Sequence, residues 1–144
     1  MTDDDIRAIL RGRHTIAVVG WSPDPARPSH GVAAFLKAQG YRVLAVNPGQ
    51  AGREALGEVI RPDLAALAQE GVDMIDIFRR PEHVPGVVRA ALEHLPGLRT
   101  VWMQLGIRSP EARALAEARG ISVVEDRCPA IEIPRLGLQA RGRA

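Results

Sequence analysis

The chain has 144 residues, of which 46% are hydrophobic and 25% are charged, a size and composition typical of one globular domain. The formal net charge is only +2 and aromatic residues make up 3%, so the dispersed basic residues do not indicate a nucleic-acid-binding surface. The single cysteine excludes an intrachain disulfide, and no apolar run approaches the ~20 residues that cross a bilayer.

The two ends of the chain carry opposite charge. The N-terminus, Met1 to Asp5, is acidic where a secretory signal would be basic, so we expect a cytoplasmic protein. Part of the positive charge lies between Arg135 and Arg143, where we expect a solvated end. We therefore predict one domain over residues 1–136 and a frayed C-terminal tail over residues 137–144.

In the first half of the chain, helical patterns alternate with apolar runs. Thr2 is placed to cap the start of a helix, and Asp5, three residues later, is placed to complete a capping box. Gly40 is placed to end a later helix. The elements predicted there are, in chain order, a helix over 2–10, a strand over 15–19, a helix over 30–39, a strand over 41–46 and a short extended piece at 59–60.

The second half continues the same alternation. Pro62 begins a helix, Pro85 is tolerable only in a first helical turn, and Ser109 caps a helix that Gly120 ends. The elements predicted there are a helix over 62–70, a strand over 72–78, a helix over 82–95, a strand over 100–104, a helix from 109 and a strand over 121–125. The remainder is irregular or helical.

Alternating strands and helices predict an α/β protein with a Rossmann-like, doubly wound, five-stranded parallel sheet and helices on both faces. Of the orders such sheets adopt, we expect 3-2-1-4-5, with the strands numbered along the chain. Sheets of this kind bind ligands outside the carboxyl ends of their strands, so the loops that follow the strands are the candidate site.

The loop after the first strand is the leading candidate for binding phosphate. Gly20 allows close approach of a backbone, Ser22 and Ser29 offer hydroxyls, and Arg27 can pair with a phosphate near the next helix N-terminus. The structural alternative is that Gly20 only makes a tight turn and Ser29 only caps a helix. The candidate residues of this loop are Gly20, Trp21, Ser22, Pro23, Arg27 and Ser29.

The second strand ends in a neutral pair, Asn47 and Pro48, where a dinucleotide-binding sheet places an acid for the ribose hydroxyls. The glycine-rich fingerprint is also missing, because the next glycine after Gly20 is Gly31. Binding of NAD is therefore disfavoured, whereas coenzyme A (CoA), whose ribose carries a 3′-phosphate, stays compatible with a neutral strand end. Alternatively, Asn47 only closes a turn.

Polar residues also follow the third and fourth strands. Arg79 and Arg80 come after Phe78 beside a helix N-terminus, and they form an anion site if they converge or a solvated pair if they do not. His83 touches ligand or serves as a capping or surface residue. The fourth strand ends in Gln104, Leu105 and Gly106, where backbone groups can recognise an adenine edge or a pantetheine amide.

The histidines and the cysteine give weaker signals. The four histidines lack metal-ligand spacing with each other or with Cys128, and no motif of a catalytic nucleophile occurs. Arg127 can favour the thiolate of Cys128, but a buried, inert cysteine is the commoner case. Because the fifth strand lies at the sheet edge, we expect Cys128 at some distance from the phosphate loops.

Taken together, the motifs resemble the small stand-alone CoA-binding domain family, over about residues 3 to 136. The motifs that carry the resemblance are Val18-Val19-Gly20-Trp21-Ser22-Pro23 with Arg27-Pro28-Ser29, Val46-Asn47-Pro48, Leu56-Gly57-Glu58, the run from Val72 to Arg80, the run from Val101 to Ile107, and Asp126-Arg127-Cys128. One departure is Ala130, which stands before Ile131 and Glu132 where the family tends to have a lysine.

The family is similar to the CoA-binding domain of the succinyl-CoA synthetase alpha subunit, which implies a Rossmann-like fold with CoA laid across the strand carboxyl ends. The synthetase's phosphorylated histidine lies in a second domain that has no counterpart in this sequence, so the resemblance implies binding without ligase chemistry. The contacts that it implies are Gly20 to Ser22, Arg27, Ser29, Asn47-Pro48, Ile77 to Arg80, and Gln104 to Gly106.

Three functions remain open. The first is a non-catalytic protein that binds CoA or acyl-CoA, as a carrier, a sensor or a partner in a mixed disulfide with CoA. The second is a component of a CoA ligase or acyltransferase that needs a partner subunit, and the third is an NAD(P)-binding redox regulator. The lack of a convincing base or nucleophile favours the first, with a small-molecule ligand and neither nucleic acid nor membrane as partner.

Overall fold

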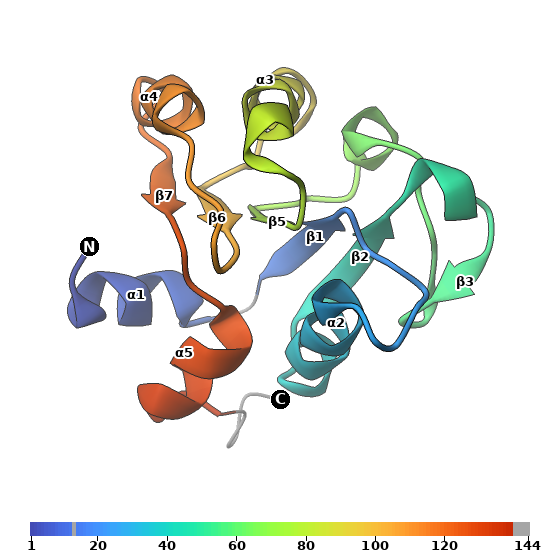
Figure 1. Cartoon of the computed structure of the whole chain (residues 1–144), viewed down its shortest axis with the longest axis horizontal. Coiled ribbons are helices and arrows are strands. Elements are labelled where there is room, and N and C mark those ends of the chain that lie inside the picture. The colour runs from blue at the N-terminus through green and yellow to red at the C-terminus, as the bar shows by residue number, and fades with distance from the viewer. Residues whose placement is uncertain (13, 140–144) are drawn as a thin grey trace.

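The computed structural model describes residues 1–12 and 14–139 and confirms the Rossmann-like α/β fold, with a five-stranded parallel sheet between two layers of helices (Figure 1). The sheet strands are β1 (Thr15–Val19), β2 (Arg42–Val46), β5 (Met74–Ile77), β6 (Thr100–Met103) and β7 (Ser122–Val124). The α-helices are α1 (Asp3–Leu10), α2 (Pro28–Ala38), α3 (Val84–His94), α4 (Pro110–Glu117) and α5 (Pro129–Arg135). Shorter pieces are η1 (Pro48–Gln50), η2 (Leu64–Leu67), η3 (Pro81–His83) and the two-stranded β3 (Glu54–Ala55) with β4 (Glu58–Val59).

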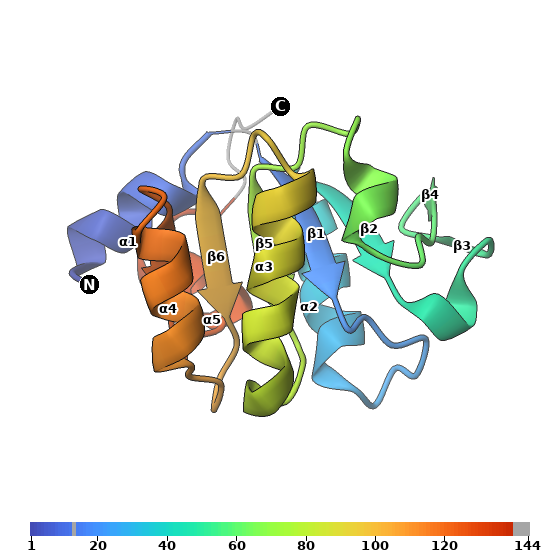
Figure 2. The ribbon, with the colours of Figure 1, turned by 90° about the horizontal axis from the view of Figure 1, so that it is seen from above.

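The strands are apolar because helices cover both faces of the sheet. Figure 2 looks down on the face that α3 and α4 cover, and α1, α2 and α5 lie on the opposite face. Along β1, Ala17 packs in the cluster beneath α3 and α4, whereas Ile16 and Val18 pack in the cluster beneath α1, α2 and α5. Burial on both faces explains why the strands read as continuous apolar runs.

The predicted strand order was wrong: the sheet has the order β2-β1-β5-β6-β7, which is 2-1-3-4-5 along the chain. The outer edge of β2, where we had expected the third strand, is occupied by the segment that follows β2. There the Arg61 N–H donates to the Ala45 carbonyl at 3.0 Å, and the Asn47 N–H donates to the Arg61 carbonyl at 3.0 Å. The chain then crosses back over β1, so β5 pairs with β1 instead.

The handedness of the crossovers explains which face each helix covers. The chain moves outward from β1 to β2 through α2, and then moves in the opposite direction from β2 to β5 through η2. Right-handed crossovers that run in opposite directions along a sheet must use opposite faces. Accordingly, Leu64 and Leu67 of η2 pack in the cluster that contains α3, across the sheet from α2.

The predicted caps of the first helix and of the helix after Ser109 are confirmed. Thr2 and Asp5 form the expected reciprocal cap of α1, and the Ser109 hydroxyl accepts from the Ala112 N–H at the start of α4. The helix predicted over 62–70 is wrong, because only the single turn of η2 forms there, with Asp63 as its cap. Pro85 lies in the first turn of α3, where its missing N–H costs nothing.

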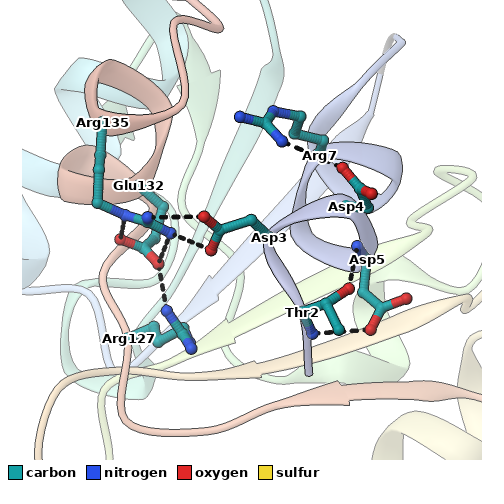
Figure 3. Close-up of polar contacts among 8 residues, drawn as sticks. All are labelled: Thr2, Asp3, Asp4, Asp5, Arg7, Arg127, Glu132 and Arg135. Carbon is teal, nitrogen blue, oxygen red and sulfur yellow. Dashed lines mark hydrogen bonds and ion pairs between the residues drawn. The ribbon is translucent and has the colours of Figure 1, made fainter.

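The C-terminal helix is tied to the N-terminal helix by a network of charges (Figure 3). Glu132, whose side chain is 6% exposed, accepts from Arg127 Nη1 at 2.6 Å and from Arg135 Nε at 3.0 Å. Arg135, whose side chain is 41% exposed, also pairs with Asp3 of α1 at 2.9 Å, so it is held in place by an ion pair. Of the predicted frayed tail, Leu138 donates its N–H to the Ile133 carbonyl, and residues 140–144 lie outside the described residues.

Within the described residues, the longest helices have 11 residues, and none is long and apolar enough to cross a bilayer.

Candidate ligand-binding site

An open cavity of 1190 Å³ lies at the carboxyl ends of the strands. It sits where the winding of the sheet reverses, because the neighbouring strands β1 and β5 lead into helices on opposite faces, α2 and α3. Reversal points of this kind are where open α/β sheets leave a crevice for ligands. The corrected strand order therefore brings the loop after β1 next to the two arginines after β5.

Most of the residues predicted as site residues line this cavity. They are Gly20, Trp21, Ser22, Arg27, Ser29, Asn47, Pro48, Phe78, Arg79, Arg80, His83, Gln104 and Leu105. Three predicted residues are not among the lining residues. Ile77 is fully buried in the core, Pro23 is exposed, and the Gly106 N–H donates to the Asp126 carboxylate at 2.7 Å.

The sequence did not point to the wall that α3 and η2 contribute. This wall has small and apolar side chains, among them Leu64, Gly86, Val87 and Ala90. A helical pattern predicts that one face of a helix is covered, but it does not show whether sheet or ligand covers it. Only the tertiary structure therefore shows which face of α3 lines the cavity.

Gly20 is required by the close approach of β1 and β5. Its φ is +86°, and a Cβ atom on it would lie 2.7 Å from the Phe78 carbonyl oxygen. On its other side, its N–H donates to the Val46 carbonyl at 3.2 Å. Any larger residue would have to push apart the two loops that carry the predicted phosphate contacts.

The loop after β1 is held in place by side chains that had been predicted as ligand contacts. The Ser22 N–H donates to the Ser29 hydroxyl at 2.9 Å, so Ser29 supports the loop, and no side chain caps α2. Asn47 does close a turn, because its Oδ1 accepts from the Gly49 N–H at 2.8 Å. Its Nδ2 also donates to the Trp21 carbonyl at 2.8 Å, which joins the loops after β1 and β2.

The aromatic residue of this loop packs into the wall of the cavity. Trp21 is 5% exposed, and its ring stacks on that of His30 with centroids 5.7 Å apart. His30 Nδ1 lies 3.1 Å from the Ser22 carbonyl, so this histidine is committed to the loop. Together these contacts give the cavity a preorganised wall on the α2 side.

The cavity carries an excess of positive charge. Arg27, Arg79 and Arg80 line it, are exposed, and form no ion pair within the described part of the chain, whereas Asp63 is its one lining carboxylate. The N-terminus of the 11-residue helix α2, which has no side-chain cap, adds a partial positive charge. This arrangement favours an anionic ligand.

Next to Gln104, which lines the cavity, lies a buried acid that the sequence analysis missed. Asp76 lies in the middle of the sheet on β5 and is completely inaccessible, and burial raises the pKa of its carboxyl group well above the usual range. Its polar neighbour is the side-chain amide of Gln104, which lines the cavity. An aspartate inside the apolar run Met74–Ile77 was the signal that could have identified it.

Cys128 lies closer to the site than expected, because it lines the same cavity, with 6% of its surface exposed. Asp126 adopts a left-handed conformation with φ of 55°, and the Arg127 N–H donates to the Met103 carbonyl. These two features turn the chain after β7 back toward the end of β6. The Arg127 guanidinium is 2.6 Å from Glu132, so it is already paired with a carboxylate.

No three His, Cys, Asp or Glu side chains in residues 1–12 and 14–139 converge where they could hold a metal ion. Over these residues the polar side chains that line the cavity are arginines, amides, hydroxyls, one carboxylate, one imidazole and one thiol.

Comparison with known proteins adds a family to this geometry. The model of a family described as CoA binding domain matches residues 14–134. The Bacillus subtilis protein YneT is 35% identical over 124 residues, which cover 86% of this chain and 88% of YneT.

Two solved structures are similar over nearly their whole length. A Thermus thermophilus protein is 43% identical, with a TM-score of 0.82 over 94% of this chain and 99% of that one. A Pyrococcus horikoshii protein is 34% identical, with a TM-score of 0.86 over 94% of this chain and 92% of that one. The residues matched by the family model, 14–134, include every residue that lines the cavity.

Proposed function

The chain belongs to the CoA binding domain family, and from this premise we propose that it binds coenzyme A or an acyl-CoA across the strand ends and acts as a carrier or sensor without catalysing a reaction. The observation that carries the proposal is the cavity lined by the N-terminus of α2 and by three arginines that form no ion pair within residues 1–12 and 14–139. CoA has a diphosphate and a 3′-phosphate that match this charge. Charge-assisted hydrogen bonds to such groups contribute roughly 1.5–3 kcal/mol each.

The size and lining of the cavity support a long ligand with one charged and one neutral end. Its volume of 1190 Å³ exceeds the roughly 300–1,000 Å³ of typical small-molecule sites. The arginines come from the loops after β1 and β5, whereas Leu105, Ile107 and Cys128 provide weakly polar surface toward β6 and β7. We therefore place the phosphates of CoA beside the arginines and its pantetheine arm beside Leu105, Ile107 and Cys128.

Two further features support binding of CoA over binding of NAD and over catalysis. The strand β2 ends in Asn47, whose amide is already engaged by Trp21 and Gly49, where NAD-binding sheets use an acid for the ribose hydroxyls. His30 is held against the Ser22 carbonyl, which leaves it poorly placed to serve as a general base.

A single cysteine fits a reducing compartment, so we place the protein in the cytoplasm.

Isothermal titration calorimetry of the purified protein with CoA, dephospho-CoA, acetyl-CoA, NADH and NADPH tests the proposal. We expect CoA and acetyl-CoA to bind, and dephospho-CoA to bind about tenfold more weakly, since a lost charged contact is worth about 1.4 kcal/mol or more. Equal affinity for CoA and dephospho-CoA would contradict recognition of the 3′-phosphate. Tighter binding of NADH than of CoA would refute the proposed function.

A further inference from the structure

The strand order divides the cavity into three regions of different chemistry. The sheet order β2-β1-β5-β6-β7 puts the arginines of the loops after β1 and β5 in the middle. Leu105 and Ile107, which follow β6, line the cavity on one side of them, and the end of β2 with the segment after it lines the other side. The proposed placement of the phosphates and the pantetheine arm therefore directs the adenosine end of CoA to the β2 side.

The β2 side of the cavity offers an apolar surface for a base. The Asn47 N–H donates to the Arg61 carbonyl at 3.0 Å, so two segments of the chain run side by side where they reach the cavity. Pro48 and Pro62, the next residue on each segment, both line it. Between residues 46 and 64 no basic residue lines the cavity, so a phosphate would find no counter-charge there. A flat, uncharged ring such as adenine suits this region better than a phosphate does.

Asp63 gives this region its one charged group, and it is the only carboxylate among the described residues that line the cavity. Its Oδ1 accepts from the Ala66 N–H at 3.1 Å and so caps η2. Within the described residues its side chain forms no ion pair and no other hydrogen bond, so Oδ2 is free to accept from a ligand. In a cavity that attracts an anion, a carboxylate weakens binding unless a donor of the ligand meets it.

Of the donors that CoA has, the 6-amino group of adenine fits this carboxylate best. In NAD-binding sheets an acid near the end of the second strand accepts from the ribose hydroxyls. In CoA the ribose 3′-hydroxyl carries a phosphate, which would repel a carboxylate placed at the ribose. The 6-amino group is uncharged, has two N–H donors and lies on the edge of the base that is remote from the ribose.

We propose that Asp63 Oδ2 accepts a hydrogen bond from the 6-amino group of adenine, with the base packed against Pro48 and Pro62. Asp63 is then a specificity-determining residue that selects adenine over a 6-oxo purine. Hypoxanthine has an acceptor where adenine has a donor, so two acceptors would face each other. This inference rests on the proposed binding of CoA, and it adds which end of the ligand meets β2 and which base is selected.

Calorimetry with CoA and with deamino-CoA, in which hypoxanthine replaces adenine, tests the inference. We expect the wild type to bind deamino-CoA about tenfold more weakly than CoA, since a hydrogen bond to a charged group is lost. Asp63→Asn keeps an oxygen for the Ala66 N–H and presents an amide donor in place of Oδ2. It should therefore bind CoA about tenfold more weakly than the wild type does, and deamino-CoA at least as tightly as CoA. A structural Asp63 would weaken both ligands without exchanging their order.

Asp24→Asn is a matched control. Asp24 is exposed, holds a turn by accepting from the Ala26 N–H at 2.9 Å, and does not line the cavity. This variant loses the same charge as Asp63→Asn and should keep the wild-type preference for CoA. Asp63→Ser, whose hydroxyl can still cap η2, is a second variant in case Asp63→Asn fails to fold, and it should lose that preference.

Three results would overturn the inference. They are equal binding of CoA and deamino-CoA by the wild type, a preference for CoA that Asp63→Ser retains, and binding of CoA by Asp63→Asn that is as tight as in the wild type or tighter. The last result would show that the carboxylate only repels the ligand. In each of these cases CoA still binds and the proposed function stands. If the wild type bound no CoA, the proposed function itself would fall, and this inference with it.

Discussion

Replacing Gly20 by alanine tests how closely β1 and β5 approach at the site. The substitution places a side chain at φ +86°, which costs about 1–2 kcal/mol for an L-residue and is partly offset by the lower entropy of the unfolded chain. The new Cβ would also lie 2.7 Å from the Phe78 carbonyl oxygen. Relief of that contact requires movement of backbone in the sheet, which adds about 1–3 kcal/mol.

Gly12 provides a matched control, because it has the same φ of +86° and nothing within 4 Å of its added Cβ. Gly12→Ala should therefore lower the free energy of unfolding by about 1 kcal/mol, and Gly20→Ala by about 2–4 kcal/mol. Urea denaturation followed by circular dichroism, with equal m-values required for all three proteins, gives both differences. Equal losses in the two variants would refute the steric argument at Gly20.

Three further predictions concern charges and the thiol. Arg27→Ala and Arg80→Ala should each weaken CoA binding about tenfold in calorimetry while the melting temperature hardly changes, because exposed loop arginines contribute little to folding. As a control, Arg119 is exposed and outside the cavity, so Arg119→Ala should change neither the affinity for CoA nor the melting temperature. Cys128→Ser should leave the Kd for CoA within about threefold of the wild-type value. Mass spectrometry after incubation with oxidised CoA should show no stoichiometric adduct on the wild type, since Cys128 is only 6% exposed. An adduct on the wild type that is absent from Cys128→Ser would show that the thiol is reactive. Glu132→Gln should cost about 1–3 kcal/mol at neutral pH, because two arginines lose a buried carboxylate. Burial raises the pKa of Glu132, but the hydrogen bonds and charges of Arg135 and Arg127 together outweigh it and leave the pKa lowered. The stabilisation by Glu132 is therefore present above the ordinary range of a glutamate and is lost as the pH falls. The difference between variant and wild type should therefore shrink below pH ~4, and a difference independent of pH would contradict this assignment.

The elements of the sheet could be predicted from the sequence, because each strand is buried on both faces over most of its length and is therefore mainly apolar. Thr15–Val19 and Arg42–Val46 illustrate this, since each ends at a polar or glycine position that lies at the carboxyl edge of the sheet. The loops after the strands could be predicted as the site for the same reason. Parallel strands all end at one edge, whatever their order, so Gly20, Arg80 and Gln104 had to lie on that edge. Only the observed order places Gly20 next to the loop that carries Arg80.

Two features depended on contacts between segments far apart in the chain, and only the tertiary structure decided them. The strand order followed from the hydrogen bonds of Arg61 along β2, which local propensity does not encode. The position of Cys128 followed from the turn at Asp126 that returns the chain to β6.

The sequence by itself determined the α/β class and the edge of the sheet that carries the cavity, because periodicity and turn residues act over a few positions. It did not reveal that Asp76 of β5 meets Gln104 of β6, since that contact joins the ends of two strands linked by α3. Only the tertiary structure shows that this aspartate is completely buried and forms no ion pair within the described residues, and that burial raises the pKa of its carboxyl group.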